Sequence, residues 1–196
     1  MARSRPRPSP SSSSDRAVRR LFDRAEIQDT LARYARGVDR GDWELVRSAY
    51  HPDACDDHGE YNGNVDGLIE WLARRFSGID NSTHFLGNCL IEFAAPGRAL
   101  VETYFVSARL CHPAGDHAKQ AGTGDTTCRQ SWGRYVDRFE RRAGCWRIAR
   151  RRVVLEAVYV FDVSGGSTSG PATRGRRDRR DPLYQALAEI RKTPRA

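Results

Sequence analysis

The spacing of the hydrophobic residues changes part-way along this chain. In the first part they recur every three or four positions, as at Ile27, Leu31, Tyr34 and Val38, which is typical of one face of an α-helix. From Phe85 onward they alternate with polar residues, which is typical of β-strands. This order predicts an α+β fold, in which three N-terminal helices pack on one face of a strongly curved, mainly antiparallel sheet.

The helical part contains three sets of helix signals. The first helix begins near Asp23, because Asp23 and Glu26 have the spacing of a capping box, and it ends at Gly41. Asp42 can cap a short second helix, and a third helix follows Asn64. No internal repeat is visible, so these elements and the strands belong to one domain.

Four segments have the alternation of long strands. They cover residues 85–93, 99–110, 130–140 and 146–160. A turn at Ala143 and Gly144 joins the last two as a hairpin. A weaker strand at 54–58 is expected at the edge of the sheet.

The charge of the chain is concentrated at its two ends. The net charge is +8, but residues 1–20 and 171–196 each carry +5, which leaves −2 for the 150 residues between them. A folded domain with this balance does not present the basic surface that nucleic acids require, so we expect no nucleic-acid partner. The ends predict a disordered basic tail at 1–20, a folded domain at 21–163, and a flexible linker with a basic tail at 164–196, within which 182–192 has helical spacing.

The hydropathy and the cysteine content of the chain indicate its cellular compartment. No apolar run is long enough to span a membrane, and the N-terminal residues lack the apolar core of a secretion signal, so we expect no membrane partner. The five cysteines are an odd number without a CxxC pair, which favours reduced thiols. These features predict a cytoplasmic protein.

Three polar clusters could carry chemistry. Asp39 lies at the end of the first helix, the sequence HPDACDDHG occupies 51–59, and His84 opens the strand that begins STHFLGN. A histidine that enters a sheet interior needs a hydrogen-bond partner, and an aspartate from the helix packed above it can be that partner. The alternatives are that Asp39 caps the helix end and that His84 is a satisfied core residue.

The second cluster also suggests a metal site, because histidine and carboxylate groups are suitable ligands. It offers His51, Asp56, Asp57 and His58. Their spacing matches no known metal motif, and Asp53 after Pro52 fits a turn, so we expect no metal.

Three segments of the sequence resemble the SnoaL-like branch of the nuclear transport factor 2-like superfamily. They are YARGVDRGDWELVRSAYHPDA, THFLGN and GRYVDRFERRAGCWRIARRRV, and the resemblance covers roughly 21–163. It implies a cone-shaped α+β barrel with a deep, mostly apolar pocket. This superfamily includes dehydratases, dehydrochlorinases, isomerases, cyclases and non-catalytic binding proteins.

The resemblance also implies site residues. In scytalone dehydratase, hexachlorocyclohexane dehydrochlorinase and bile acid 7α-dehydratase, an aspartate and a histidine meet in the pocket, and those motifs fall on Asp39 and His84. The tyrosine five residues before the aspartate of the bile acid enzyme falls on Tyr34. A carbonyl-polarising tyrosine of scytalone dehydratase falls on His58, and its tyrosine directly before the aspartate is replaced here by Val38.

We therefore predict four catalytic residues: Asp39, His84, His58 and Tyr34. For His58 a structural role, and for Tyr34 a core role, remain alternatives. Five further residues are expected to bind substrate: Asp57, Asn88, Tyr104, Trp132 and Arg152. By strand alternation Arg152 points to the pocket side, whereas Arg141, Arg142, Arg150 and Arg151 form a solvated face of the sheet.

Imidazole can accept a proton near neutral pH, and a carboxylate bonded to one ring nitrogen stabilises the imidazolium that forms. The predicted function is thus a cofactor-independent lyase, such as a dehydratase, or an isomerase, acting on a small hydrophobic cyclic molecule. A homodimer or homotrimer is expected. The alternatives are a non-catalytic module that binds a ligand or a protein, which a pocket plugged by Trp132, Tyr135 or Tyr159 would favour, and a small subunit that supports a ring-hydroxylating oxygenase.

Overall fold

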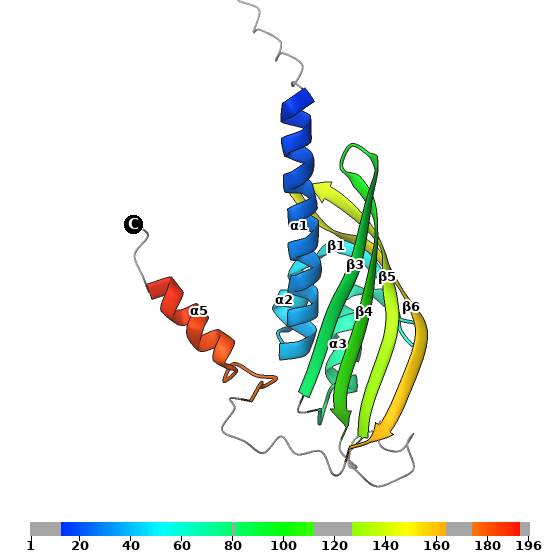
Figure 1. Cartoon of the computed structure of the whole chain (residues 1–196), viewed down its shortest axis with the longest axis vertical. Coiled ribbons are helices and arrows are strands. Elements are labelled where there is room, and N and C mark those ends of the chain that lie inside the picture. The colour runs from blue at the N-terminus through cyan, green and yellow to red at the C-terminus, as the bar shows by residue number, and fades with distance from the viewer. Residues whose placement is uncertain (1–12, 80, 112–126, 164–173, 193–196) are drawn as a thin grey trace, which may run out of the picture.

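The chain begins with two helices, continues through two short strands and a third helix, and then forms the four long strands of a curved sheet. The computed structural model describes residues 13–79, 81–111, 127–163 and 174–192. The helices are α1 (Ser13–Arg40), α2 (Trp43–Ser48) and α3 (Val65–Arg75). The strands are β1 (Tyr50–Asp57), β2 (Asn62–Asn64), β3 (Asn81–Ala95), β4 (Arg98–Cys111), β5 (Thr127–Arg142) and β6 (Cys145–Asp162). Figure 1 shows the helices on one face of the sheet, so the predicted α+β class is confirmed.

The sheet has the order β2-β1-β6-β5-β4-β3, and every pair is antiparallel except β1 with β6. In the part of the chain that the structure describes, β2 and β3 are the two edges, so the sheet is a curved, unclosed cone rather than a closed barrel. The strand expected at the edge, β1, lies one place inside it. The true edge, β2, has the sequence NGN, which carries no strand signal.

Helix α1 begins at Ser13 rather than near Asp23, so the predicted disordered tail is wrong for residues 13–20; residues 1–12 lie outside the described part of the chain. The additional turns of α1 contact β3: the Arg20 guanidinium lies 3.8 Å from the centre of the Phe93 ring, which is a cation–π contact. Asp23 and Glu26 do not form a capping box: both carboxylates accept hydrogen bonds from Trp146, at 2.9 Å each. They attach α1 to the start of β6.

Two irregular points shape the long strands. At Gly133 an added Cβ would lie 2.4 Å from the Val154 carbonyl oxygen and 3.0 Å from the Phe105 ring, so only glycine allows this close approach at the bulge beside it. In β6 the residue Ala149 is left without a partner between Ile148 and Arg150. This bulge shifts the alternation of β6 by one residue.

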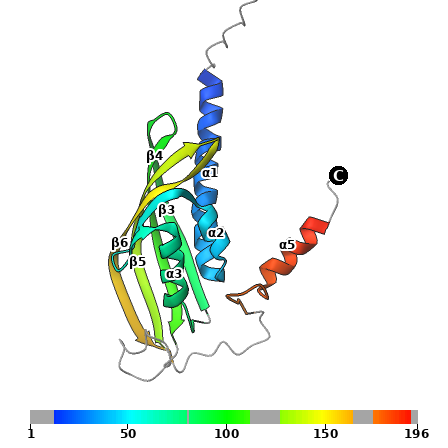
Figure 2. The ribbon, with the colours of Figure 1, turned by 180° about the vertical axis from the view of Figure 1, so that it is seen from behind.

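The predicted C-terminal helix is present as α5 (Pro182–Lys192), and Figures 1 and 2 show it standing away from the rest of the molecule. Its beginning is attached to the end of α1 and to the cap of α2: the Tyr184 hydroxyl donates to Asp42, and Arg40 pairs with Asp181 at 3.2 Å. Just before it, the Arg177 guanidinium donates to the backbone carbonyl of Asp39. The remainder of the predicted linker, 164–173, lies outside the described residues. None of the described helices is long and apolar enough to cross a membrane.

Candidate active site

Asp39 and His84 meet between the end of α1 and the start of β3. The His84 ring Nδ1 lies 2.7 Å from Asp39 Oδ1, within the expected hydrogen-bond range, and the His84 backbone N–H donates to Oδ2 at 2.8 Å. The Ser82 hydroxyl donates to Oδ1 at 2.9 Å. The predicted contact is therefore present, and it orients both side chains.

These hydrogen bonds determine the charge of Asp39 and the tautomer of His84. Burial alone would raise the pKa of the Asp39 carboxyl, but the hydrogen bonds from His84 and Ser82 outweigh it and hold that pKa below its usual value. An ionised Asp39 accepts a proton-bearing Nδ1, so the lone pair of the neutral His84 ring is on Nε2. Asp39 is thus a partner of the histidine rather than a helix cap.

A second aspartate–histidine pair lies at the end of β1. His58 Nδ1 forms a short hydrogen bond with Asp56 Oδ1, and His58 Nε2 lies 3.2 Å from the Tyr34 hydroxyl. Asp56 is fully buried and also accepts a hydrogen bond from Tyr50 at 2.6 Å. Burial raises the pKa of Tyr34, so this phenol stays protonated and available as a donor.

Both histidines line the same cavity, which has a volume of about 310 Å³. A row of aromatic rings connects them: His84 and Phe105 have ring centres 6.3 Å apart, Phe105 stacks on Tyr135 at 4.4 Å, and Tyr135 meets Tyr34 edge-on at 5.7 Å. The cavity volume is at the lower end for small-molecule sites, about 300–1,000 Å³, so one or two rings fit it. Tyr135 forms a wall of this cavity and does not plug it.

A buried ion pair supports the aromatic row from behind. Arg151 is 0% exposed, bonds to both carboxylate oxygens of Asp137 at 2.7–2.8 Å, and lies between the rings of Tyr34 and Tyr135, at 4.1 and 3.9 Å from their centres. The expectation that Arg151 is solvated is therefore wrong, because the bulge at Ala149 turns it inward. The Asp137 carboxylate holds the pKa of Arg151 above its usual value, although burial alone would lower it.

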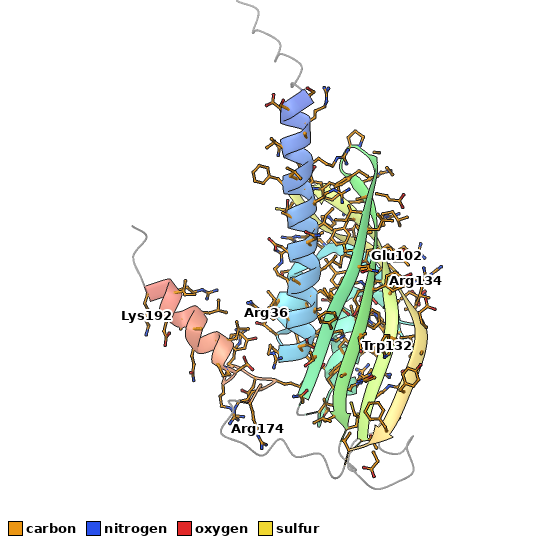
Figure 3. All side chains as sticks on the ribbon, viewed as in Figure 1. Arg36, Glu102, Trp132, Arg134, Arg174 and Lys192 are labelled. Carbon is orange, nitrogen blue, oxygen red and sulfur yellow. The ribbon has the colours of Figure 1, made fainter. Side chains whose placement is uncertain are left out.

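The five expected substrate-binding residues do not line this cavity. Asn88, Tyr104 and Trp132 border an apolar groove on the opposite face of the sheet. Figure 3 labels Trp132 on the long strands, below Glu102 and Arg134. The side chain of Arg152 is 60% exposed and pairs with Asp57 at 3.4 Å, at the surface. Both faces of β4 carry apolar residues, so alternation alone does not indicate which face is inward.

Sequence reasoning missed the polar residues at the end of the cavity next to His84. Ser107, Arg109, Arg129 and Ser131 come from β4 and β5, and Arg75 comes from α3. On β4 the serine and arginine lie on the same face as Phe105, and on β5 they lie on the same face as Tyr135. Because both aromatic rings line the cavity, the serines and arginines point into it as well. A strand prediction that used the buried Phe105 as its reference would have found them.

The alternative metal site is not assembled. His51 bonds through Nε2 to the backbone carbonyl of Glu140, away from the Asp56–His58 pair. Among the described residues, no group of three or more histidine, cysteine, aspartate or glutamate side chains is placed to hold a metal ion.

A model of the SnoaL-like domain matches residues 19–152, which is more than half of the chain. The chain belongs to the SnoaL-like domain family. The matched part of this SnoaL-like domain contains both aspartate–histidine pairs, and it ends inside β6.

Solved structures have the same fold as this SnoaL-like domain. The hexachlorocyclohexane dehydrochlorinase LinA-type3 from Novosphingobium barchaimii LL02 aligns with a TM-score of 0.64 and 17% identity, over 80% of this chain and 99% of its own. The Kfla4162 protein from Kribbella flavida aligns with a TM-score of 0.61 and 18% identity, over 71% of this chain and 94% of its own. No curated protein sequence matches the chain. At these identities the likeness to the solved structures shows the shared fold alone.

Proposed function

We propose that this SnoaL-like domain is a cofactor-independent lyase or isomerase that removes a proton from a small cyclic substrate. The observation that carries the proposal is that two aspartate–histidine pairs face one small, aromatic-lined cavity. One pair can act as the base, while the other serves as the source of a proton. A similar structure belongs to a dehydrochlorinase, which supports an elimination reaction on this fold.

His84 is the general base in this proposal. Its Nε2 takes a proton from a carbon next to a carbonyl group, and Asp39 stabilises the imidazolium that forms, because the carboxylate is ionised and bonded to Nδ1. The Phe105 ring beside His84 lowers the local polarity, which strengthens this attraction. The electron pair of the broken C–H bond forms the new double bond.

Tyr34 and His58 donate a proton or a hydrogen bond to the substrate oxygen that gains negative charge, which is the departing hydroxyl or the carbonyl oxygen. When His58 is protonated, its Nε2–H donates to the Tyr34 oxygen, which leaves the Tyr34 O–H free to donate into the cavity. A departing hydroxyl takes the Tyr34 proton and leaves as water, while Tyr34 regains a proton from His58. In an isomerisation the same donor polarises the carbonyl, and His84 returns its proton to another carbon.

The test uses 3-hydroxy cyclic ketones of one and two rings, in neutral and carboxylate-bearing forms. Loss of water produces a conjugated enone that is followed by ultraviolet absorbance, and proton abstraction is followed by deuterium uptake from D₂O. We expect turnover that His84→Gln lowers at least about 10²-fold. His51→Gln is the matched control, because His51 lies in the same fold but bonds to a backbone carbonyl outside the cavity.

The competing function is a non-catalytic binding module. Two of the three residues expected to plug its pocket, Trp132 and Tyr159, are not among the residues that line the cavity. Binding of the ketones without enone formation and without deuterium uptake would support this module and contradict the lyase or isomerase.

A further inference from the structure

The end of the cavity next to His84 is lined by positive charge. Arg109 of β4 and Arg129 of β5 are direct register partners and both line the cavity, together with Arg75 of α3. One step along the same strands, Ser107 and Ser131 form the next inward pair, and Ser107 is the partner of His84 on β3. The arginine row therefore lies about 6–7 Å along the strands from the row of the base.

Arg109 is a buried cation among other cations in the part of the chain that the structure describes. The pKa of Arg109 is lowered to about 10, because the group is buried and because Arg75, Arg129 and Arg177 lie near it. Its guanidinium stands 5.0 Å from the centre of the Phe76 ring, a cation–π contact that stabilises the cation but supplies no negative charge. Among the described residues, no carboxylate forms an ion pair with Arg109.

Arg129 is in a similar position. Burial and the charge of Arg75 lower its pKa, although the nearby Glu60 carboxylate acts in the opposite direction. The Nε of Arg129 is buried without a hydrogen-bond partner in the described part of the chain. Arg75 itself pairs with Glu60, which also lines the cavity. A buried donor without a hydrogen-bond partner destabilises the folded protein, and neighbouring guanidinium groups repel each other. An anion bound between them would accept the hydrogen bond and reduce the repulsion.

We propose that Arg109 and Arg129 form a subsite for a carboxylate group of the substrate. A planar guanidinium matches a carboxylate with two parallel hydrogen bonds, and the Ser107 and Ser131 hydroxyls border the same space. The substrate class is then a carboxylate with one or two rings, whose rings lie on Phe105 and Tyr135 and whose acidic C–H faces His84. This assignment rests on the proposed function for the role of His84, but not for the binding of the anion.

The test measures binding of naphthalene-2-carboxylate by titration calorimetry, with its neutral amide and with 2-naphthyl phosphate as matched probes. We expect the carboxylate to bind at least about tenfold more tightly than the amide and more tightly than the phosphate, and its affinity to fall with added salt. Arg109→Met should remove the preference for carboxylate. Arg129→Met is the second variant, and Arg150→Met, at an exposed position of β6, should change nothing.

Two further measurements separate this subsite from the proposed reaction. Arg109→Met should unfold at a temperature no lower than the unmodified protein, because it removes a crowded buried cation. His84→Gln should retain carboxylate binding.

Equal binding of amide and carboxylate, or full carboxylate affinity in Arg109→Met, would overturn the subsite while leaving the reaction possible on neutral ketones. Tighter binding of the phosphate would also overturn the carboxylate assignment. Selective carboxylate binding without any turnover would leave the subsite standing and remove the proposed reaction.

Discussion

Asp39 holds His84 at two points, through the ring Nδ1 at 2.7 Å and through the backbone N–H at 2.8 Å. The second contact joins the carboxylate to the strand itself, so the aspartate positions both the ring and the first residues of β3. Loss of the imidazole therefore leaves Asp39 with the backbone N–H and the Ser82 hydroxyl as donors. The role of the base and the support of the strand can be separated by mutation.

His84→Gln should lower turnover at least about 10²-fold, because the amide cannot accept a proton near neutral pH. The thermal midpoint should change little, because glutamine can still donate a hydrogen bond to Asp39 and its backbone contact is unaltered. Turnover and thermal unfolding are measured on the same preparation. Near-native turnover in this variant would show that His84 is not the base, and unfolding would show that it is a core residue.

Asp39→Asn should change the acid limb of the stability curve. The pKa of Asp39 is lower in the folded protein than its usual value near 4, so its stabilisation is fully present above that pH and is lost as the pH falls through the folded pKa. Urea unfolding from pH 6 to pH 2 should show the variant less stable at pH 6 by about 1–3 kcal/mol, since asparagine cannot accept all three hydrogen bonds. The difference should shrink toward pH 2; a constant gap would contradict an ionised Asp39.

Tyr34→Phe should lower turnover while leaving proton abstraction measurable. The variant removes the only atom of Tyr34 that bonds to His58 and keeps the ring that stacks against Arg151. We expect elimination to fall more than deuterium uptake, because His84 is untouched. Equal losses in the rates of elimination and deuterium uptake would show that Tyr34 has a structural role and does not take part in the reaction.

Arg151→Met should destabilise the protein by about 3–5 kcal/mol, because it leaves the Asp137 carboxylate buried without its partner. The double variant Asp137→Leu with Arg151→Met should recover much of this loss. Urea unfolding of the two single variants and the double variant measures the coupling, and Arg150→Met is the exposed neighbouring control. An additive result would mean that the two charges do not depend on each other.

The face of the sheet away from the helices should be covered by a second copy of the chain. Trp132 is 47% exposed and Tyr104 46% exposed there, next to the Arg134–Glu102 ion pair. A homo-oligomer that closes by symmetry buries such a face on both copies. Light scattering should give a multiple of 22.1 kDa that Trp132→Glu reduces and Ile190→Glu, on α5, does not. A 22.1 kDa particle at micromolar concentration in the unmodified protein would contradict this.

The helices and the four long strands could be predicted from the sequence, because hydrophobic periodicity is a property of neighbouring residues. The contact between Asp39 and His84 was expected from the resemblance to the SnoaL-like family and from the need of a buried histidine for a hydrogen-bond partner. The wrong assignment of Arg151 and Arg152 has a specific cause: one unpaired residue, Ala149, reverses the alternation, and nothing in the local sequence marks that bulge. The cavity arginines were missed for a different reason. Apolar residues on both faces of β4 conceal the inward side until the position of the helices is known.

The buried Arg151–Asp137 pair also constrains how this sequence can diverge. A change to an apolar residue at one of the two positions leaves the other charge buried without its partner. A joint change to two apolar residues keeps the volume behind the Tyr34 and Tyr135 rings filled. Among descendants of this protein, positions 137 and 151 should therefore be inherited as a linked unit, either both charged or both apolar. A lineage that had lost one charge and kept the other would have to rebuild the wall of the cavity as well.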